Sequence, residues 1–333
     1  MNKSTFQTPI LFLIFNRPET TKEVFNKIKQ VKPPKLYVGA DGPRKNRDDD
    51  VKLCQQTRDI LKQINWECEI HTLFREENLG CAKAISEAVT WFFDNENMGI
   101  ILEDDCVPHP DFFPYCQEML IRYQNETRVM FISGTNFISN IKKPETSYYF
   151  SRLADVWGWA SWKRAWAKYD LLIHDWPIGS KKLLNDQYFN GFREYREIFM
   201  YSLDNLYDTT NPNTWDYQWA YRILINDGLC VVPRENLISN IGKNGVHCNN
   251  GNTLGLGMKT SSLNLSELSL IPKIEPNYEL DSVKFRETIQ IGSGFYYSMK
   301  LGSWLRKVKF LPYFKNYHPF RIGLLVKGII VRK

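Results

Sequence analysis

The amino-acid sequence predicts an α/β fold in which a mostly parallel sheet is flanked by helices. Over residues 1–135, apolar segments of strand length alternate with amphipathic segments of helix length. That alternation is typical of βαβ units, in which a helix returns the chain to the next parallel strand. The chain has 333 residues, which is enough for one large domain or two small ones.

Local signals predict the individual elements of this first part. Pro18 suits the first turn of a helix, and an apolar face follows it at Val24, Phe25 and Ile28. Acidic residues stand at the start of 48–64, where the helix dipole favours negative charge. Strands are expected over 9–15, 35–41, 68–74, 98–102 and 128–134, and helices from Pro18 onward and over 48–64, 81–95 and 111–124.

Residues 136–287 are less regular and are rich in aromatic side chains. They are expected to complete the domain that begins with 1–135 rather than to form a separate one. Residues 242–262 are rich in Gly, Asn, Ser and Thr, which predicts a mobile loop. The regular elements expected here are helices near 194–208 and 215–226 and a short strand within 228–234.

The last segment, 288–333, differs from the rest in charge. The net charge is +6, and nine Lys and Arg residues but no acidic residue follow Glu287. Residues 1–287 then hold 34 Lys and Arg against 37 Asp and Glu, a net charge of −3. The tail's positive charges are interleaved with aromatic side chains, which predicts a segment lying on an anionic membrane surface. A helical cap packed on the body is the alternative, and no recognised module favours nucleic acid.

Cysteine usage and hydropathy predict where the protein resides. The seven cysteines include no CxxC pair, so neither a disulfide framework nor a zinc site is expected. This usage favours a reducing compartment. The apolar run 8–15 is too short for a signal peptide, and no run is long enough to span a bilayer. We therefore expect a cytoplasmic protein, peripheral on the inner face of the cytoplasmic membrane if its tail binds there.

Polar residues gather where the predicted strands end. In an open parallel sheet, ligands bind at the carboxyl ends of the strands. Four loops would therefore converge on one edge of the sheet, although a lone Asp after a strand is more often a turn former or helix cap. The residues concerned are Arg17 after the first strand, Asp41 after the second, Arg75, Asn78 and Gly80 after the third, and Glu103, Asp104 and Asp105 after the fourth.

The run Glu103–Asp104–Asp105 is the sharpest of these features. An apolar strand leads directly into three adjacent carboxylates, which repel one another unless a positive charge lies between them. Mn²⁺ or Mg²⁺ would suit the run, because such ions need few protein ligands when phosphate oxygens supply the others. A solvated turn is the alternative. Neither GxxxxGK[ST] nor a GxGxxG after the first strand occurs, so neither a P-loop nor a dinucleotide site is expected.

The segments PILFLIFNRPE, VGADGP, REENLGCAKAI and IILEDDCVPHPDFFPY, in this order, resemble the GT-A class of nucleotide-sugar glycosyltransferases. The variant Glu-Asp-Asp followed by Pro-Asp-Phe-Phe is similar to the corresponding motif of the N-acetylglucosaminyltransferase I family. The chain resembles a bacterial-type relative of that family. The resemblance covers 1–135 well and 150–245 more loosely. It implies a GT-A fold, in which 1–135 binds the nucleotide sugar and 136–287 forms the donor and acceptor site.

The resemblance also implies roles for individual residues. Asp105 would bind the metal directly, and Asp104 would contact ribose or sugar hydroxyls, with Glu103 in support. Arg17 and Asp41 would contact the base. The loop of Arg75, Asn78 and Gly80 matches an R-x-x-N-x-G pattern that lies near the nucleotide.

Two further residues come from the second half of the chain. TWDYQWAYR (214–222) resembles a Trp-Asp-Asp-Trp segment of the family, which makes Asp216 the candidate catalytic base. Tyr217 and Gln218 depart from that pattern, and a helix cap is the alternative role for Asp216. His247, within GKNGVHC, would complete the metal site or touch the diphosphate. VWGWASW (156–162) resembles the aromatic loop under the donor sugar.

The predicted function is that of a metal-dependent, inverting glycosyltransferase that moves a sugar from a UDP-sugar to a hydroxyl of a glycan or lipid-linked acceptor. One alternative is a sugar-1-phosphate nucleotidyltransferase, which should show a Gly-rich loop with a basic residue after the first strand. FNRPET lacks such a loop. The other alternative is a non-catalytic carbohydrate-binding protein, which has no need of three carboxylates at a strand end.

Overall fold

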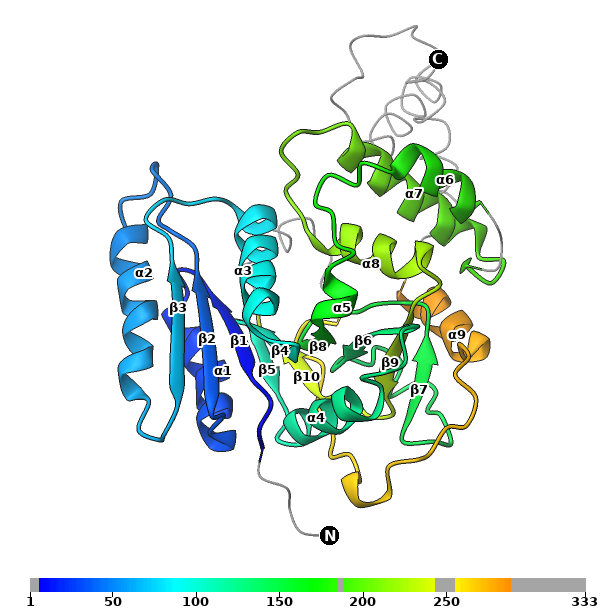
Figure 1. Ribbon diagram of the computed structural model, residues 1–333, viewed down its shortest axis with the longest axis horizontal. Coiled ribbons are helices and arrows are strands. Elements are labelled where there is room, and N and C mark those ends of the chain that lie inside the picture. Colours follow the sequence, from blue (N-terminus) through cyan, green and yellow to red (C-terminus); the bar gives the residue numbers. More distant parts are fainter. Residues whose placement is uncertain (1–5, 185–187, 243–254, 289–333) are drawn as a thin grey trace, which may run out of the picture. The chain divides into compact units, whose positions relative to one another are not determined.

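The computed structural model describes residues 6–184, 188–242 and 255–288. The chain forms two compact units, Met1–Lys284 and Phe285–Lys333, and the account below concerns the first. The predicted α/β architecture is confirmed: a large, mostly parallel sheet lies between helices (Figure 1). The predicted tail lies outside the described residues from position 289 onward.

The central sheet contains eight strands within the described residues, in the order β3-β2-β1-β4-β8-β6-β9-β7. Six of these run in one direction, and β8 and β7 run opposite to their neighbours. A small antiparallel pair, β5 (Cys106–Pro108) with β10 (Ile238–Asn240), lies beside it. The sheet strands are β1 (Ile10–Ile14), β2 (Lys35–Ala40), β3 (Glu69–Phe74), β4 (Met98–Glu103), β6 (Val129–Ser133), β7 (Tyr148–Ser151), β8 (Trp159–Trp162) and β9 (Leu229–Pro233).

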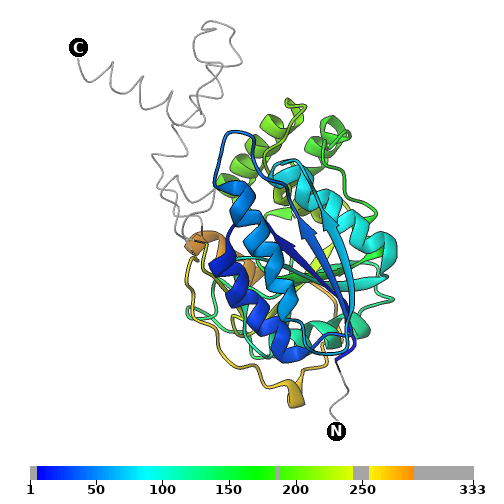
Figure 2. The same cartoon turned by 90° about the vertical axis from the view of Figure 1, so that its left-hand side faces the viewer.

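Both faces of the sheet are covered, and this explains the continuous apolar strands of the sequence. On one face, α1 (Pro18–Val31) packs Val24 and Phe25 against Phe12 of β1, and α2 (Asp50–Asp59) lies beside it (Figure 2). On the other face, α3 (Cys81–Asn95) packs Phe92 against Leu11. Successive β1 residues therefore enter opposite cores, so every residue of the strand is buried.

The strand order creates a switch point beside β1. The chain first moves outward from β1 to β2 and β3, and then crosses back to place β4 on the other side of β1. Crevices that bind ligands in open α/β sheets lie at such a point, outside the carboxyl ends of the strands. In the register of this pair, Leu13 stands beside Glu103. The residues that follow β1 and β4 are therefore neighbours in space.

The second half of the domain is held to the sheet by an aromatic cluster. Trp159 of β8 stacks on Phe131 of β6 and on Trp215, and it also packs against Trp166 and Trp219. This cluster anchors the start of α8 against the sheet. Besides α1 to α3, the described residues form α4 (Phe112–Arg122) in the first part and α5 (Lys163–Trp166), α6 (Trp176–Leu183), α7 (Arg193–Tyr207), α8 (Asp216–Ile225) and α9 (Tyr278–Thr288) in the second. The 3₁₀ turns lie at Ile60–Gln63 and Leu265–Glu267.

The predicted elements of 1–135 are present, with ends shifted by about one to three residues. The expected helix 48–64 ends earlier as an α-helix and continues as a 3₁₀ turn over Ile60–Gln63. The pair β5–β10 was not predicted, because three-residue strands carry no periodic signal of their own. Nor was α6, whose Pro177 and Gly179 are weak helix formers.

Two expectations about covalent and membrane features can be compared with the described residues. The six cysteines among them form no disulfide. Within the same ranges, we find no helix with the length and apolar character needed to cross a bilayer.

Candidate functional site

Arg17 bridges two of the three carboxylates that follow β4. Its Nε atom donates to Asp104 at 3.2 Å, and its Nη2 atom donates to the other oxygen of the same carboxylate. Nη1 donates to Asp105 at 2.9 Å. The positive charge expected beside the acidic run is therefore supplied by the chain itself, from the neighbouring strand.

The backbone of Arg17 is fixed by the first turn of α1. Its carbonyl accepts hydrogen bonds from the amide and the hydroxyl of Thr21, at 3.0 and 2.7 Å, and the Thr21 side chain is fully buried. Asp104 is 3% exposed and also accepts a hydrogen bond from the Phe15 amide. Both ends of the Arg17–Asp104 pair are thus held by the body of the domain.

The electrostatics of this pair combine burial with attraction. Burial alone would lower the pKa of Arg17, but the carboxylates of Asp104 and Asp105 raise it well above its usual value. Burial raises the pKa of Asp104 to about 6, and the charge of Arg17 opposes that rise. Asp104 is therefore ionised at neutral pH, and the guanidinium is the more strongly stabilised partner.

Glu103 has no hydrogen bond or ion pair among the described residues, although it is half-buried. Burial and the charges of Asp105 and Asp104 raise its pKa well above the usual range, and Asp216 adds to this rise. Loss of hydration and the charges of Glu103 and Asp216 also raise the pKa of the Cys81 thiol to about 12. The ends of β1 and β4, the start of α3 and the start of α8 therefore converge.

Asp105 is bordered on its other side by the chain that leaves β10. The backbone carbonyl of Asp105 accepts from the Ile241 amide at 2.9 Å, and its Oδ1 atom lies 3.5 Å from the Asn240 amide nitrogen. A Cβ atom on Gly242 would lie 2.3 Å from Oδ2 of Asp105, so any larger residue there would displace the Asp105 carboxylate. His247 lies outside the described residues, and its predicted contact with the metal or the diphosphate stays a prediction.

Asp41 organises the loop that precedes α3. One carboxylate oxygen accepts from the amides of Gly42 and Leu79, and the other accepts from the Asn78 side chain at 2.9 Å and the Gly80 amide at 3.1 Å. Four donors saturate the lone pairs of a carboxylate. The predicted contact of Asp41 with a nucleotide base stays a prediction, because these hydrogen bonds would have to rearrange to permit it.

Arg75 and Asn78 lie on this same loop, but they do not join Arg17. Arg75 forms an ion pair with Glu87 of α3 at 2.8 Å. Its carbonyl accepts from Arg58 at 2.6 Å, which also donates to the carbonyl of Asp41. Gly80 has a φ of +79°, the left-handed conformation that the turn into α3 requires. The predicted R-x-x-N-x-G loop thus exists as a rigid unit beside the carboxyl end of β2.

A polar cavity of about 260 Å³ lies next to this loop, and Asn78 is the one lining residue that the sequence predicted to lie near a ligand. It is supported by Asp50, which is fully buried and pairs with Arg44 at 2.6 Å and with the Asn16 side chain at 2.7 Å. The signal for this pair is weak in the sequence, because Arg44 and Asp50 are six residues apart in a polar segment. The residues that line the cavity are Pro43, Arg44, Lys45, Glu77 and Asn78.

The contribution of the buried Asp50 carboxylate to stability should depend on pH. The hydrogen bond from Arg44 holds the pKa of the Asp50 carboxyl well below its usual range, against the effect of burial. Its stabilising effect is therefore complete above about pH 4, the ordinary pKa of Asp, and is lost as the pH falls further. Asp50→Asn should lower the free energy of unfolding at pH 7, and the difference from the wild type should shrink at pH 3. Urea unfolding at both pH values tests this, with exposed Asp48→Asn as control; a difference that does not depend on pH would contradict it.

Asp216 begins α8 and is half-buried. Its Oδ1 atom accepts from the Thr214 hydroxyl and, at 3.0 Å, from the Tyr217 amide. Trp215, and not Asp216, occupies the position of the helix cap. Trp215 and Trp219 turn into the aromatic cluster under β8, which leaves the carboxylate on the outer side of the helix start.

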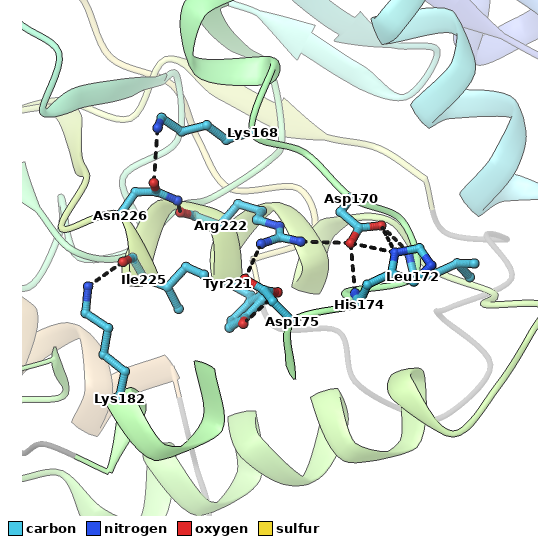
Figure 3. Close-up of polar contacts among 10 residues, drawn as sticks. All are labelled: Lys168, Asp170, Leu172, His174, Asp175, Lys182, Tyr221, Arg222, Ile225 and Asn226. Carbon is cyan, nitrogen blue, oxygen red and sulfur yellow. Dashed lines mark hydrogen bonds and ion pairs between the residues drawn. The ribbon is translucent and has the colours of Figure 1, made fainter. Parts of the chain in front are cut away.

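A segment preceding α6 runs along α8 and bonds to it at each turn, which fixes the rotation of the helix that carries Asp216. Near the start of α8, the Tyr169 hydroxyl donates to the Trp215 carbonyl at 3.2 Å. Further along, Arg222 forms ion pairs with Asp170 at 2.9 Å and Asp175 at 2.7 Å (Figure 3). Tyr221 also donates to Asp175, and Lys168 contacts Asn226 just beyond α8. From α6 itself, Lys182 donates to the Ile225 carbonyl, and within the segment His174 contacts Asp170.

Removing Arg222 should destabilise this part of the domain. Arg222 is 9% exposed, and its loss would remove the only charged partner that Asp175 has among the described residues and the guanidinium contact of Asp170. Arg222→Met should lower the free energy of unfolding by about 2 kcal/mol, since hydrogen bonds to charged groups contribute roughly 1.5–3 kcal/mol. Urea unfolding measures the change. Exposed Arg193→Met is the matched control and should stay within about 0.5 kcal/mol of the wild type; equal effects of the two changes would contradict the prediction.

Comparisons with known proteins give structural neighbours only. No family model and no curated protein matches the sequence. An apo UDP-glucose pyrophosphorylase is similar over 68% of this chain and 90% of its own, with 8% identity and a TM-score of 0.36. Mouse xyloside xylosyltransferase 1 is similar over 66% of this chain and 81% of its own, with 9% identity and a TM-score of 0.32. The match to the galactosyltransferase LgtC covers 49% of this chain and only 60% of LgtC, with 8% identity and a TM-score of 0.30. TM-scores below 0.5 do not bear on activity.

Proposed function

We propose that this protein is a glycosyltransferase that uses a nucleoside diphosphate sugar, with UDP as the nucleotide. The observation that supports this best is the cluster of Arg17, Asp104 and Asp105 at the switch point between β1 and β4. Fixed positive and negative groups side by side suit a ligand that carries both phosphate oxygens and a bridging cation. Asp216 lies close enough to Glu103 to raise its pKa. Asp216 is thus a further carboxylate near the site, one that binding of the cation and the phosphates does not require.

The proposed cation is Mn²⁺ or Mg²⁺, and Asp105 fits it. The Asp105 side chain is 14% exposed, and in the described part of the chain its Oδ1 atom has only two weak neighbours, the Cys106 thiol at 3.4 Å and the Asn240 side-chain nitrogen at 3.5 Å. Within the described ranges, no group of three His, Cys, Asp or Glu side chains could hold a metal by itself. The ion would therefore depend on phosphate oxygens for most of its ligands. Once bound, it would neutralise charge on the departing nucleoside diphosphate.

The protein's own residues would perform the remaining steps. Arg17 would donate to a phosphate oxygen and help to stabilise the leaving group. Asp216 would accept the proton of the acceptor hydroxyl as that oxygen attacks the anomeric carbon. A single displacement of this kind inverts the configuration at the anomeric carbon. Thr214 and the Tyr217 amide hold one oxygen of Asp216, which leaves the other oxygen for the acceptor.

The proposed acceptor is a hydroxyl of a glycan or of a lipid-linked saccharide. The basic, aromatic tail after Glu287 is the reason to include the lipid-linked class, since such a tail suits an anionic membrane surface. The same feature underlies the proposed location at the inner face of the cytoplasmic membrane. Binding of the full chain to vesicles containing anionic lipid, compared with neutral vesicles, tests this part.

One assay separates the proposed function from its alternatives. Release of UDP from a panel of UDP-sugars is measured with Mn²⁺, with Mg²⁺ and with a chelator, in the presence of saccharide acceptors. We expect cation-dependent release from one or two donors. Formation of a UDP-sugar from UTP and a sugar 1-phosphate would instead identify a nucleotidyltransferase. Binding of saccharides without turnover of any donor would identify a carbohydrate-binding protein.

A further inference from the structure

We propose that Asp104 is a positioning residue for Arg17, and that Arg17 makes cation binding at Asp105 conditional on a diphosphate ligand. This inference rests on the proposed function, because it assumes a cation at Asp105. It adds a reason why the site would select nucleoside diphosphates over monophosphates. Its basis is the way in which one guanidinium divides its nitrogen atoms between two adjacent carboxylates.

The two contacts of Arg17 use different edges of the guanidinium. Nε and Nη2 form a two-pronged pair with the carboxylate of Asp104, a geometry that fixes the plane of the group. Nη1 makes a single contact, with Oδ2 of Asp105 at 2.9 Å. The first contact can persist while the second is exchanged. Nη1 is therefore the nitrogen that is available to a ligand.

The two carboxylates also differ in exposure, and the one that holds the guanidinium plane is the more buried. The Asp104 side chain is 4% exposed, whereas that of Asp105 is 14% exposed and that of Arg17 is 30% exposed. Arg17 and Asp105 thus keep surface that a ligand can reach, whereas Asp104 is almost completely buried. Asp104 lies beneath them as an anchor, and it has little surface left for a sugar hydroxyl.

A cation at Asp105 would compete with Nη1 of Arg17 for the same carboxylate. Oδ2 of Asp105 already accepts from Nη1, and the Gly242 backbone closes the space on another side. A divalent cation bound to Oδ1 of this carboxylate would be repelled by a guanidinium that donates to the other oxygen. Without a nucleotide, Arg17 therefore competes with the cation, and the affinity for the cation alone should be low.

A diphosphate would relieve this opposition because it carries two adjacent anionic groups. One group supplies oxygens to the cation, and the other accepts the hydrogen bond from Nη1 as it leaves Asp105. A monophosphate has only one group to offer both partners. Cation and diphosphate should therefore each raise the affinity for the other, by the same factor.

Binding of Mn²⁺ to the full chain, followed by electron paramagnetic resonance of the free ion, tests the proposal without any turnover. In the wild type, UDP should raise the Mn²⁺ affinity about tenfold or more, within the usual range of coupling, and UMP should do so much less. Arg17→Gln should bind Mn²⁺ without nucleotide about tenfold more tightly than the wild type, and its enhancement by UDP should shrink. Misfolding cannot produce tighter binding. Arg47→Gln removes an exposed positive charge from the loop after β2 and should leave Mn²⁺ binding without nucleotide unchanged.

The variants of Asp104 test its positioning role. Asp104→Asn should weaken Mn²⁺ binding and reduce the enhancement by UDP, and Asp104→Glu should restore part of that enhancement. Equal Mn²⁺ affinities of the wild type and Arg17→Gln, or equal tightening by Arg47→Gln, would overturn the inference and leave the proposed function standing. Absence of any Mn²⁺ binding by the wild type with UDP would instead overturn the proposed metal site itself.

Discussion

Asp105→Asn should lower kcat/KM for sugar transfer by about a thousandfold, the upper part of the range for losing one electrostatic contact to a transition state. Asp105 is the least buried of the paired carboxylates and the one with an oxygen that has only weak partners. An amide keeps the shape but loses the charge that a hard divalent cation requires. The measurement is UDP release from the best donor over a range of Mn²⁺ concentrations.

The control for this prediction is Asp111→Asn. Asp111 also follows the acidic run, but its carboxylate accepts from Ser262 and from the Leu263 amide. This variant should retain transfer within about threefold of the wild type, a factor that corresponds to less than 1 kcal/mol. Full activity of Asp105→Asn at all Mn²⁺ concentrations would remove Asp105 as the cation ligand. Restoration at high Mn²⁺ would instead show a weakened but surviving site.

Asp216→Asn should lower kcat by about 10²–10⁴, the usual contribution of a general base, with little change in the KM for the donor. The amide can still interact with Thr214, but it cannot accept a proton from the acceptor. Stopped or steady-state assays with saturating donor and acceptor measure kcat. Hydrolysis of the donor by water should fall less than transfer, since water needs less precise placement than a saccharide hydroxyl.

The matched control is Asp208→Asn, which removes an exposed carboxylate from the neighbouring end of α7. Its kcat should equal that of the wild type. If Asp216→Asn keeps most of its transfer activity, Asp216 is not the base. An equal loss in both variants would point to the net charge of this surface rather than to a single proton acceptor.

The regular elements of 1–135 could be predicted because their signals are local. Every residue of β1 is buried, since α1 lies on one face of the sheet and α3 on the other. A strand of this kind appears in the sequence as an unbroken apolar run. The pair β5–β10 could not be predicted in this way, because Cys106 meets Asn240 only through the tertiary fold.

The sequence predicted that polar loops meet at one edge of the sheet, but not which of their side chains are in contact. The convergence of polar loops follows from the parallel sheet, and the structure places Arg17 against the acidic run. The sequence did not indicate that the Asp41 carboxylate accepts hydrogen bonds from its own loop, or that the Arg44–Asp50 pair supports a cavity beside that loop. Those outcomes depend on which donors lie within about 3 Å of each carboxylate, a distance that residue spacing does not specify.

The amino-acid sequence alone was sufficient to establish the alternation of strands and helices and the presence of charged residues where strands end. Both follow from side-chain periodicity and from the cost of burying polar groups, which act over a few residues. Only the tertiary structure decided which of those charged residues meet. The placement of β4 beside β1 brings Arg17 to Asp104 across a gap of 87 residues, and the aromatic cluster under β8 holds the helix of Asp216 near Glu103. Strand order and core packing are long-range properties, so the site takes its form only when the whole domain folds.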